Sequence, residues 1–281
     1  MNLLNGKELS LKIRQDIKRE IKEDFTGKKL RVPTLAVVLV GEDPASQIYV
    51  RNKENACKEV GIESITIKLP QTATKEDVLE RIRVLNDDEL VDGILVQLPL
   101  PNGIDSNEII ESISPDKDVD GLTYVNKGKL VSNLGDLAPC TPSGIIDLLK
   151  YYNVEIEGKN AVIIGRSQLV GRPVEILLNN LNATTTICHS KTQNLKEITA
   201  GADILIVAVG KPNYITGDYV KDGASVIDVG INRLDGKIVG DVDIRTLENR
   251  DVNITPVPGG VGPMTITELL KNTIKCAKQH R

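Results

Sequence analysis

A tyrosine and a lysine capable of stacking and proton chemistry lie in the segment Ser-Gln-Ile-Tyr-Val-Arg-Asn-Lys, residues 46–53. We predict a helix here, so Tyr49 and Lys53, at positions i and i + 4, share one helix face. An amine beside an aromatic ring could act in general acid–base catalysis, although the same spacing is common in solvated Tyr/Lys pairs. Short-chain dehydrogenases also use Y-x-x-x-K, but there the pair follows the glycine-rich loop, whereas here it precedes the loop.

Gln97 and a run of aspartates supply polar groups outside this helix. Gln97 lies late in an aliphatic stretch, where a buried amide without a partner would cost about 1–3 kcal/mol. It therefore either holds a loop in place or points into a cleft. Asp116, Asp118 and Asp120 alternate, but no glutamate closes a calcium loop at the required distance. A carboxylate on such a loop suits a ligand edge that presents two adjacent N–H donors.

A strand that runs into a glycine turn and a helix is predicted at residues 161–173. Such a turn offers backbone N–H groups and a helix N-terminus to a phosphate. The middle glycine of G-x-G-x-x-G is replaced, so a plain strand-to-helix turn stays an alternative. Arg166 can pair with a phosphate through its planar guanidinium. Ser190 and Lys191 stand where an acid usually binds the ribose of NAD, which favours the 2′-phosphate of NADP.

Glycine- and proline-rich segments could also approach a flat ligand closely. The predicted strands at 203–209 and 225–229 end in small residues, which would let a nicotinamide ring approach the backbone near Gly210 and Gly230. The segment Pro256–Met264 could run close to a flat ligand without interference from side chains.

Alternating strands and helices must position these residues. Short continuous apolar runs and an aromatic content of only 2% are typical of parallel sheets packed by Val, Ile and Leu. The predicted fold class is therefore α/β, with two α/β domains and a boundary near residue 142. The predicted strands are 35–40, 64–69, 92–99, 160–164, 183–188, 203–209 and 225–229, and the predicted helices are 44–60, 74–85, 107–113, 142–152, 170–181, 195–200 and 265–278.

The composition excludes several classes of function. A net charge of −4 with both signs scattered argues against binding to nucleic acid or an anionic membrane surface. The longest apolar runs, such as 35–40, are far shorter than the ~20 residues that cross a bilayer. The N-terminus has no apolar signal-peptide region, so we expect a cytoplasmic protein. Four cysteines without a C-x-x-C pair and two histidines predict reduced thiols and no metal site.

Taken together, these motifs resemble one family along the whole chain. The sequence is similar to the bifunctional methylenetetrahydrofolate dehydrogenase/methenyltetrahydrofolate cyclohydrolase (FolD) family. The stretches that carry the resemblance are 41–46 with Tyr49 and Lys53, 94–101 around Gln97, 116–121, 139–142, 165–167, 188–192 and 256–265.

The resemblance implies a fold and two successive reactions. Residues 1–141 would form a catalytic folate-binding domain, on which the helix at about 264–281 packs back. Residues 142–263 would form a Rossmann-type NADP-binding domain, with the catalytic cleft between the two. A hydride would pass from 5,10-methylenetetrahydrofolate to NADP+, and water would then convert the methenyl cation to 10-formyltetrahydrofolate. Family members are commonly homodimers that pair through the cofactor domain.

The resemblance also assigns roles to individual residues. Lys53 would steer proton transfer around the attacking water, and Gln97 would hydrogen-bond its amine. Tyr49 would stack on the folate, and Asp120 would bind the amino edge of the pterin. Further contacts would come from two sets of residues: Pro258 and Gly259 for the substrate, and Gly165, Arg166, Ser167, Ser190 and Ile231 for NADP.

Two other functions fit parts of the sequence. A monofunctional NAD(P)-dependent methylenetetrahydrofolate dehydrogenase would have no need of the Lys53 and Gln97 pair. A non-catalytic dinucleotide-binding regulator would have no use for the polar residues of the first domain. A formyltetrahydrofolate synthetase activity is excluded, because it needs ATP and a much longer chain and no G-x-x-x-x-G-K-[ST] loop occurs.

Overall fold

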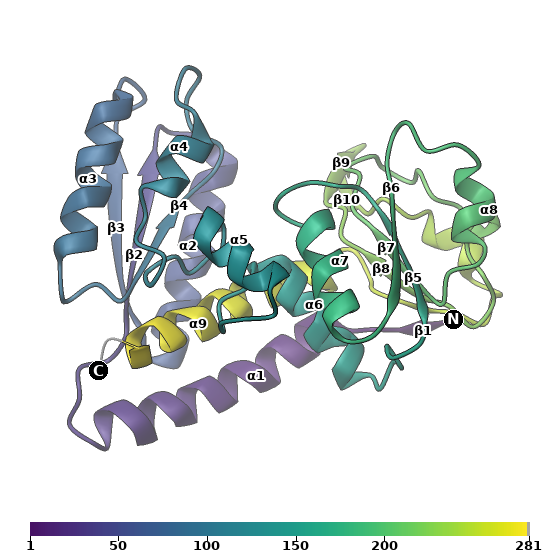
Figure 1. The fold of residues 1–281 in the computed structure, drawn as a ribbon, viewed down its shortest axis with the longest axis horizontal. Helices are drawn as coiled ribbons and strands as arrows, with labels where there is room; N and C mark the ends of the chain where they lie inside the picture. The colour runs from purple at the N-terminus through teal and green to yellow at the C-terminus, as the bar shows by residue number, and fades with distance from the viewer. Residues whose placement is uncertain (280–281) are drawn as a thin grey trace. The chain divides into compact units, whose positions relative to one another are not determined.

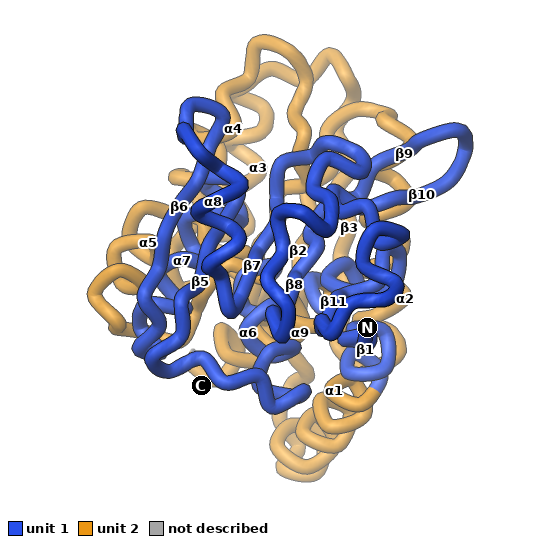
Figure 2. Tube along the Cα trace, turned by 90° about the vertical axis from the view of Figure 1, so that its right-hand side faces the viewer, with its two compact units in different colours: residues 1–11, 141–265 blue, residues 12–140, 266–281 orange. Residues whose placement is uncertain are grey.

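The computed structural model describes residues 1–279 (Figure 1). The chain forms two compact units (Figure 2): unit 1 contains residues 1–11 and 141–265, and unit 2 contains residues 12–140 with the described residues from 266 onward. Each unit is built on a parallel sheet with helices, so the predicted two-domain α/β fold class is confirmed.

Unit 2 contains a three-stranded parallel sheet in the order β3-β2-β4. Its strands are β2 (Thr34–Val40), β3 (Glu63–Leu69) and β4 (Gly93–Val96). Its helical segments are most of α1 (Gly6–Glu20), a π-helical turn (Ile21–Thr26), α2 (Pro44–Val60), α3 (Lys75–Asp87), α4 (Ser106–Glu111), α5 (Tyr124–Val131) and the larger part of α9 (Val261–Gln279).

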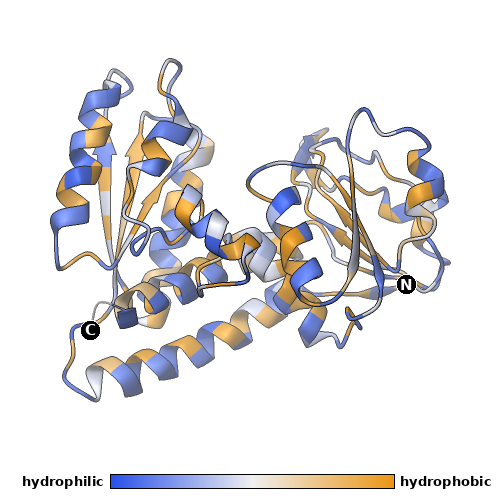
Figure 3. Cartoon of the chain, in the orientation of Figure 1, coloured by the Kyte–Doolittle hydropathy of each residue, from blue (hydrophilic) through white to orange (hydrophobic). Residues whose placement is uncertain are grey.

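The central strand of this sheet, β2, is buried on both faces. Its odd-numbered residues, such as Val37, pack with Phe25 and with residues of α2 and α9 such as Leu270. Its even-numbered residues, such as Val38, pack instead with α3 and α4. Figure 3 shows this strand hydrophobic along its length, whereas the surrounding helices alternate between apolar and polar residues. Because both faces of β2 are buried, residues 35–40 are a continuous run of apolar residues.

Unit 1 contains a six-stranded parallel sheet in the order β1-β11-β8-β7-β5-β6 and an antiparallel hairpin of β9 and β10. The strands are β1 (Asn2–Leu3), β5 (Asn160–Ile164), β6 (Thr184–Cys188), β7 (Ile204–Val207), β8 (Ser225–Asp228), β9 (Asn232–Leu234), β10 (Lys237–Val239) and β11 (Asn253–Ile254). The helices are α6 (Cys140–Tyr151), α7 (Gly171–Asn180), α8 (Leu195–Thr199) and short 3-10 turns at Gly217–Tyr219 and Ile244–Leu247.

The observed division of the chain differs from the predicted domain bounds at its N-terminus. The predicted first domain starts at residue 1, but residues 1–11 belong to unit 1. The physical reason is that β1 extends the sheet of unit 1 by pairing with β11. From residue 266, α9 packs in the core of unit 2, as Leu269 and Ile274 show. The last two residues of the predicted segment 264–281 lie outside the described residues.

Each predicted strand and helix occurs, most of them with shifts at their ends. The last helix begins at Val261 and not at residue 265, since Pro263 lies in its first turn, where no backbone donor is needed. The predicted start of this helix at residue 265 was therefore four residues too late. The strands and α-helices that the sequence pattern missed are β1, α1, α5, β9, β10 and β11. Among residues 1–279, no helix is long and apolar enough to cross a membrane.

A buried lysine anchors the loop that carries Asp120. Lys117 is 7% exposed, and its Nζ donates to the backbone carbonyl oxygens of Leu85, Asn86 and Asp88 at 3.1, 2.8 and 2.8 Å. Two of these carbonyls end α3, where an ammonium group satisfies acceptors that the helix leaves unpaired. The Lys117 carbonyl oxygen accepts from Ile94 N at 2.7 Å, which attaches the loop to β4.

We predict that Lys117→Met lowers the stability of the protein by about 2–3 kcal/mol, because three carbonyls, one buried and two partly buried, lose a charged donor. Urea unfolding followed by circular dichroism measures the change. Lys68→Met, which alters an exposed lysine on β3, is the matched control. An unchanged midpoint for Lys117→Met would show that water satisfies these carbonyls as well as the ammonium group does.

Candidate functional site

Lys53 and Gln97 meet at the carboxyl end of the sheet of unit 2. Helix α2 starts directly after β2, because Asp43 accepts a hydrogen bond from Ser46 N at 2.7 Å and caps the helix. Gln97 follows β4, and its backbone N–H donates to Val38 O at 2.9 Å. These two segments bring Lys53 Nζ within 2.9 Å of Gln97 Oε1, to which it donates a hydrogen bond.

The Gln97 amide is held at both of its ends. Its Nε2 donates to Leu98 O at 2.7 Å, while its Oε1 accepts from Lys53. Because Nε2 donates to a backbone carbonyl, Oε1 is the amide atom that faces the Lys53 amine. Of the two roles expected for Gln97, holding a loop in place or pointing into a cleft, the bond to Leu98 O supports the first.

Asp120 lies close enough to Lys53 for their charges to interact. Burial raises the pKa of the Asp120 carboxyl, whereas the positive charge of Lys53 lowers it. Cys140 Sγ lies 3.6 Å from Asp120 Oδ1 and donates a weak hydrogen bond to it. Burial raises the pKa of the Cys140 thiol well above its ordinary value, so the sulfur keeps its proton for this contact.

Asp118 is bound by other hydrogen-bond donors. It is 1% exposed, and its Oδ2 accepts from Thr123 N at 2.8 Å and from Asn126 Nδ2 at 2.9 Å. Its carboxylate therefore fixes the loop before α5, while Asp120 is only half-buried. The contact of Cys140 with Asp120 was not anticipated from the sequence, although the Pro-Cys-Thr-Pro motif marked the position.

Tyr49 completes the group in unit 2. It lies one turn before Lys53 on α2, and 45% of its surface is exposed. An exposed tyrosine ring offers an apolar face to a flat ligand. Tyr49, Lys53, Gln97 and Asp120 thus combine a stacking surface, an oriented amine and a carboxylate.

The predicted phosphate turn lies at the carboxyl end of β5 in unit 1. Gly165 has φ +122°, and a Cβ atom there would lie 2.2 Å from Ala208 O, so only glycine fits. Ser167 Oγ accepts from Val170 N at 3.2 Å and from Gly171 N at 3.4 Å, so it helps to start α7. Arg166 is exposed beside this turn.

Ser190 lies at the end of the neighbouring strand β6, which pairs with β5 along its whole length. The turn that carries it is closed by His189 N donating to Thr192 Oγ1 at 2.8 Å and by Lys191 N donating to His189 Nδ1 at 3.2 Å. Ser190 and Lys191 are both exposed. Arg166 and Ser190 therefore end adjacent strands, as a site for a phosphate group requires.

Ile231, Pro258 and Gly259 also belong to unit 1. Ile231 follows β8, is 54% exposed, and its Cδ1 would lie 3.7 Å from a Cβ atom at Gly262. Gly259 has φ +103°, and its carbonyl oxygen accepts from Lys7 N at 2.8 Å. Pro258 and Gly259 thus belong to unit 1, whereas the other residues expected to bind substrate, Tyr49, Gln97 and Asp120, belong to unit 2.

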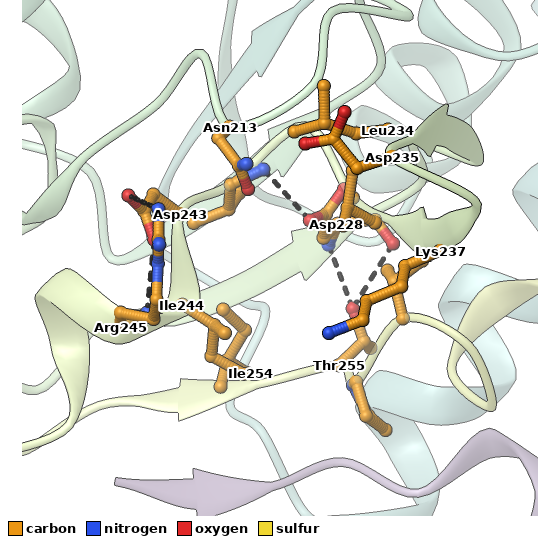
Figure 4. Close-up of a pocket in the computed structure, with 15 residues that line it drawn as sticks. Asn213, Asp228, Leu234, Asp235, Lys237, Asp243, Ile244, Arg245, Ile254 and Thr255 are labelled. Atoms are coloured by element: carbon orange, nitrogen blue, oxygen red, sulfur yellow. Dashed lines mark hydrogen bonds and ion pairs between the residues drawn. The ribbon is translucent and has the colours of Figure 1, made fainter.

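Unit 1 also contains a cavity of about 380 Å³. None of the single residues predicted for the site lines it, although Pro256 and Val257 of the segment Pro256–Met264 do. Figure 4 shows Asp228 beside Thr255 and Asp243 beside Arg245, with their hydrogen bonds drawn. The lining residues are Asn213, Asp228, Leu234, Asp235, Lys237, Val239, Gly240, Val242, Asp243, Ile244, Arg245, Ile254, Thr255, Pro256 and Val257. In the described part of the chain, no group of three or more His, Cys, Asp or Glu side chains could hold a metal ion.

Comparison with known proteins identifies the family. Residues 4–120 match the profile of the tetrahydrofolate dehydrogenase/cyclohydrolase catalytic domain, and residues 139–281 match that of its NAD(P)-binding domain. The bifunctional protein FolD of Campylobacter hominis is 56% identical over 279 residues, which cover 99% of this chain and 98% of that protein.

Two solved structures share the fold over nearly the full length. The bifunctional FolD enzyme of Campylobacter jejuni is 50% identical, with a TM-score of 0.97 and 100% coverage of both chains. The Trypanosoma brucei methylenetetrahydrofolate dehydrogenase-cyclohydrolase, solved with NADP and an inhibitor, is 37% identical, with a TM-score of 0.93 and coverage of 99% and 97%. This chain belongs to the tetrahydrofolate dehydrogenase/cyclohydrolase family.

Proposed function

We propose that this protein is a bifunctional enzyme of folate one-carbon metabolism. It oxidises 5,10-methylenetetrahydrofolate to 5,10-methenyltetrahydrofolate with NADP+ and then hydrolyses the methenyl compound to 10-formyltetrahydrofolate. The observation that carries this proposal is the hydrogen bond from Lys53 to Gln97, formed within electrostatic reach of Asp120 in a chain of this family.

The bifunctional reading is favoured over a monofunctional dehydrogenase. Hydride transfer moves no proton, so an oriented amine is needed for hydrolysis and not for oxidation. The full-length relatives at 50–56% identity are named as bifunctional proteins. A non-catalytic dinucleotide-binding regulator would have no use for Lys53 and Gln97.

The residues of unit 2 are suited to hold the folate and to handle protons. The exposed ring of Tyr49 would stack on the ligand, and the Asp120 carboxylate would accept two N–H groups from the amino edge of the pterin. Water adds to the methenyl carbon and loses one proton, which leaves a neutral hydroxyl adduct. The hydroxyl then loses its second proton as the bond from that carbon to N5 breaks and N5 gains a proton, so one proton is released overall. Lys53, oriented by Gln97 Oε1, would carry these transfers at its Nζ.

The residues of unit 1 fit NADP. Gly165 has no side chain that could block a pyrophosphate at this turn. Another residue would not fit there, because its Cβ would collide with the backbone. Arg166 and Ser190, exposed at the ends of paired strands, would bind the 2′-phosphate, while Ser167 and Ile231 would contact other parts of the dinucleotide. When bound, NADP+ accepts the hydride from the one-carbon bridge.

Family membership supports four further proposals. The protein would act as a homodimer, pairing through the cofactor-binding unit, and it would work in the cytoplasm. Unit 2 would serve as the catalytic folate-binding domain and unit 1 as the NADP-binding domain. Pro258 and Gly259 would contribute to substrate binding from unit 1.

Lys53→Met is expected to lower the rate of methenyltetrahydrofolate hydrolysis by at least about 100-fold, the lower range for loss of a proton-transfer group. The absorbance of supplied methenyltetrahydrofolate measures this rate without cofactor. The affinity for NADP should stay within about two-fold, because Lys53 lies in the other unit.

The matched control is Lys58→Met, which alters an exposed lysine of the same helix and should hydrolyse the substrate normally. Hydrolysis by Lys53→Met at nearly the wild-type rate would show that another group moves the protons.

Arg166→Ala is expected to reduce kcat/KM for NADP by roughly 10- to 150-fold, since a hydrogen bond to a charged phosphate contributes about 1.5–3 kcal/mol. NAD lacks the 2′-phosphate, so its use should change much less. Arg172→Ala, an exposed arginine in the first turn of α7, is the control. Equal losses with both cofactors would assign Arg166 to a general structural role.

A further inference from the structure

Asp241 is a buried carboxylate to which the reaction described above gives no role. It is 0% exposed and lies two residues after β10. Its Oδ2 accepts from Val209 N at 2.7 Å and from Gly210 N at 3.0 Å. Its Oδ1 accepts from Lys211 N at 2.9 Å and from Asn232 Nδ2 at 2.9 Å. Three consecutive backbone N–H groups are therefore gathered on one carboxylate.

A second buried carboxylate holds Asp241 in place. Asp228 Oδ1 accepts from Asp241 N at 2.9 Å and from Gly230 N at 3.0 Å, and its Oδ2 accepts from Val242 N at 2.9 Å. Burial raises the pKa of Asp228 to about 6, and these backbone donors oppose the rise. The pair connects the backbone after β8 with the backbone after β10.

The glycines around the pair leave room for these carboxylates. A Cβ atom at Gly230 would lie 2.3 Å from Asp241 Oδ1, and one at Gly240 would lie 1.8 Å from Asp228 Oδ2. Small residues at the end of β8 were expected to admit a nicotinamide ring. At Gly230, the structure gives a different reason, which is the close approach of Asp241.

The segments that Asp241 holds lie on the edge that carries the phosphate turn. Strands β5, β7 and β8 are parallel neighbours, so Gly165, residues 209–211 and residues 230–232 all follow carboxyl ends of adjacent strands. Ligands of open parallel sheets bind at this edge. Ile231 lies between Gly230, whose N–H donates to Asp228, and Asn232, whose amide donates to Asp241.

We propose that Asp241 is a positioning residue for the nicotinamide half of the dinucleotide, an inference that rests on the proposed function. Its carboxylate fixes the backbone at 209–211 and, through Asn232, the segment of Ile231. Arg166 and Ser190, at the ends of β5 and β6, do not contact Asp241 and would bind the adenosine half independently of it.

The test compares Asp241→Asn with Asp243→Asn, which alters a carboxylate two residues along that binds Arg245 and not the 209–211 backbone. For each variant, kcat/KM for NADP, the affinity for 2′-phospho-ADP-ribose and cofactor-free hydrolysis of methenyltetrahydrofolate are measured. The probe 2′-phospho-ADP-ribose lacks only the nicotinamide.

We expect Asp241→Asn to lower kcat/KM for NADP at least about ten-fold, since the amide nitrogen must face backbone donors. Binding of 2′-phospho-ADP-ribose and the hydrolysis rate should stay within about two-fold, and Asp243→Asn should match the wild type. If Asp241→Asn does not fold, Asn232→Ala removes one donor and should show the same selective loss at about three-fold.

Equal losses for NADP and 2′-phospho-ADP-ribose would overturn the inference, because they indicate general damage to unit 1. An unchanged kcat/KM for NADP in both Asp241→Asn and Asn232→Ala would overturn it as well. A wild-type protein that reduces no NADP+ with methylenetetrahydrofolate would instead contradict the proposed function itself.

Discussion

The hydrogen bond from Lys53 Nζ to Gln97 Oε1 is the interaction on which the proposed chemistry depends. It joins the helix after β2 to the segment after β4, and both strands end at the same edge because they are parallel neighbours. The Asp43 cap sets where α2 begins, and the backbone bond from Gln97 to Val38 sets where the amide lies. A flexible amine thereby gains a fixed direction, which proton transfer to one atom requires.

Among the aspartates described above, Asp118 and Asp241 hold backbone segments in place, whereas Asp120 is available to bind a ligand. Asp118 and Asp241 are buried and accept two and four hydrogen bonds, respectively, from N–H donors, so they act as internal anchors. Asp120 is half-buried and accepts a weak hydrogen bond from the Cys140 thiol, and the charge of Lys53 lowers its pKa. The number of N–H donors bound to the carboxylate, and not residue type, thus separates a structural aspartate from one that could bind a ligand.

Elements with strong local signals were predictable from the sequence. Helix α2 has the predicted bounds because Pro44 begins it and Gly61, with φ +90°, ends it. Strands β1 and β11 were missed, since each is two residues long and exists only through pairing between distant segments. Lys53, Gln97 and Asp120 could be proposed from the family resemblance, but the anchoring by Lys117 and Asp241 could not, because their partners are set by tertiary packing.

The central claim is that Lys53 and Gln97 work as one unit in hydrolysis, and a double-mutant cycle tests it most directly. The rate of cofactor-free methenyltetrahydrofolate hydrolysis is measured for Lys53→Met, Gln97→Met and the double variant. Residues that act as a unit lose function non-additively, so the double variant should be within about three-fold of Lys53→Met. A double variant whose rate falls by the product of the two single losses would show that the amine and the amide act independently.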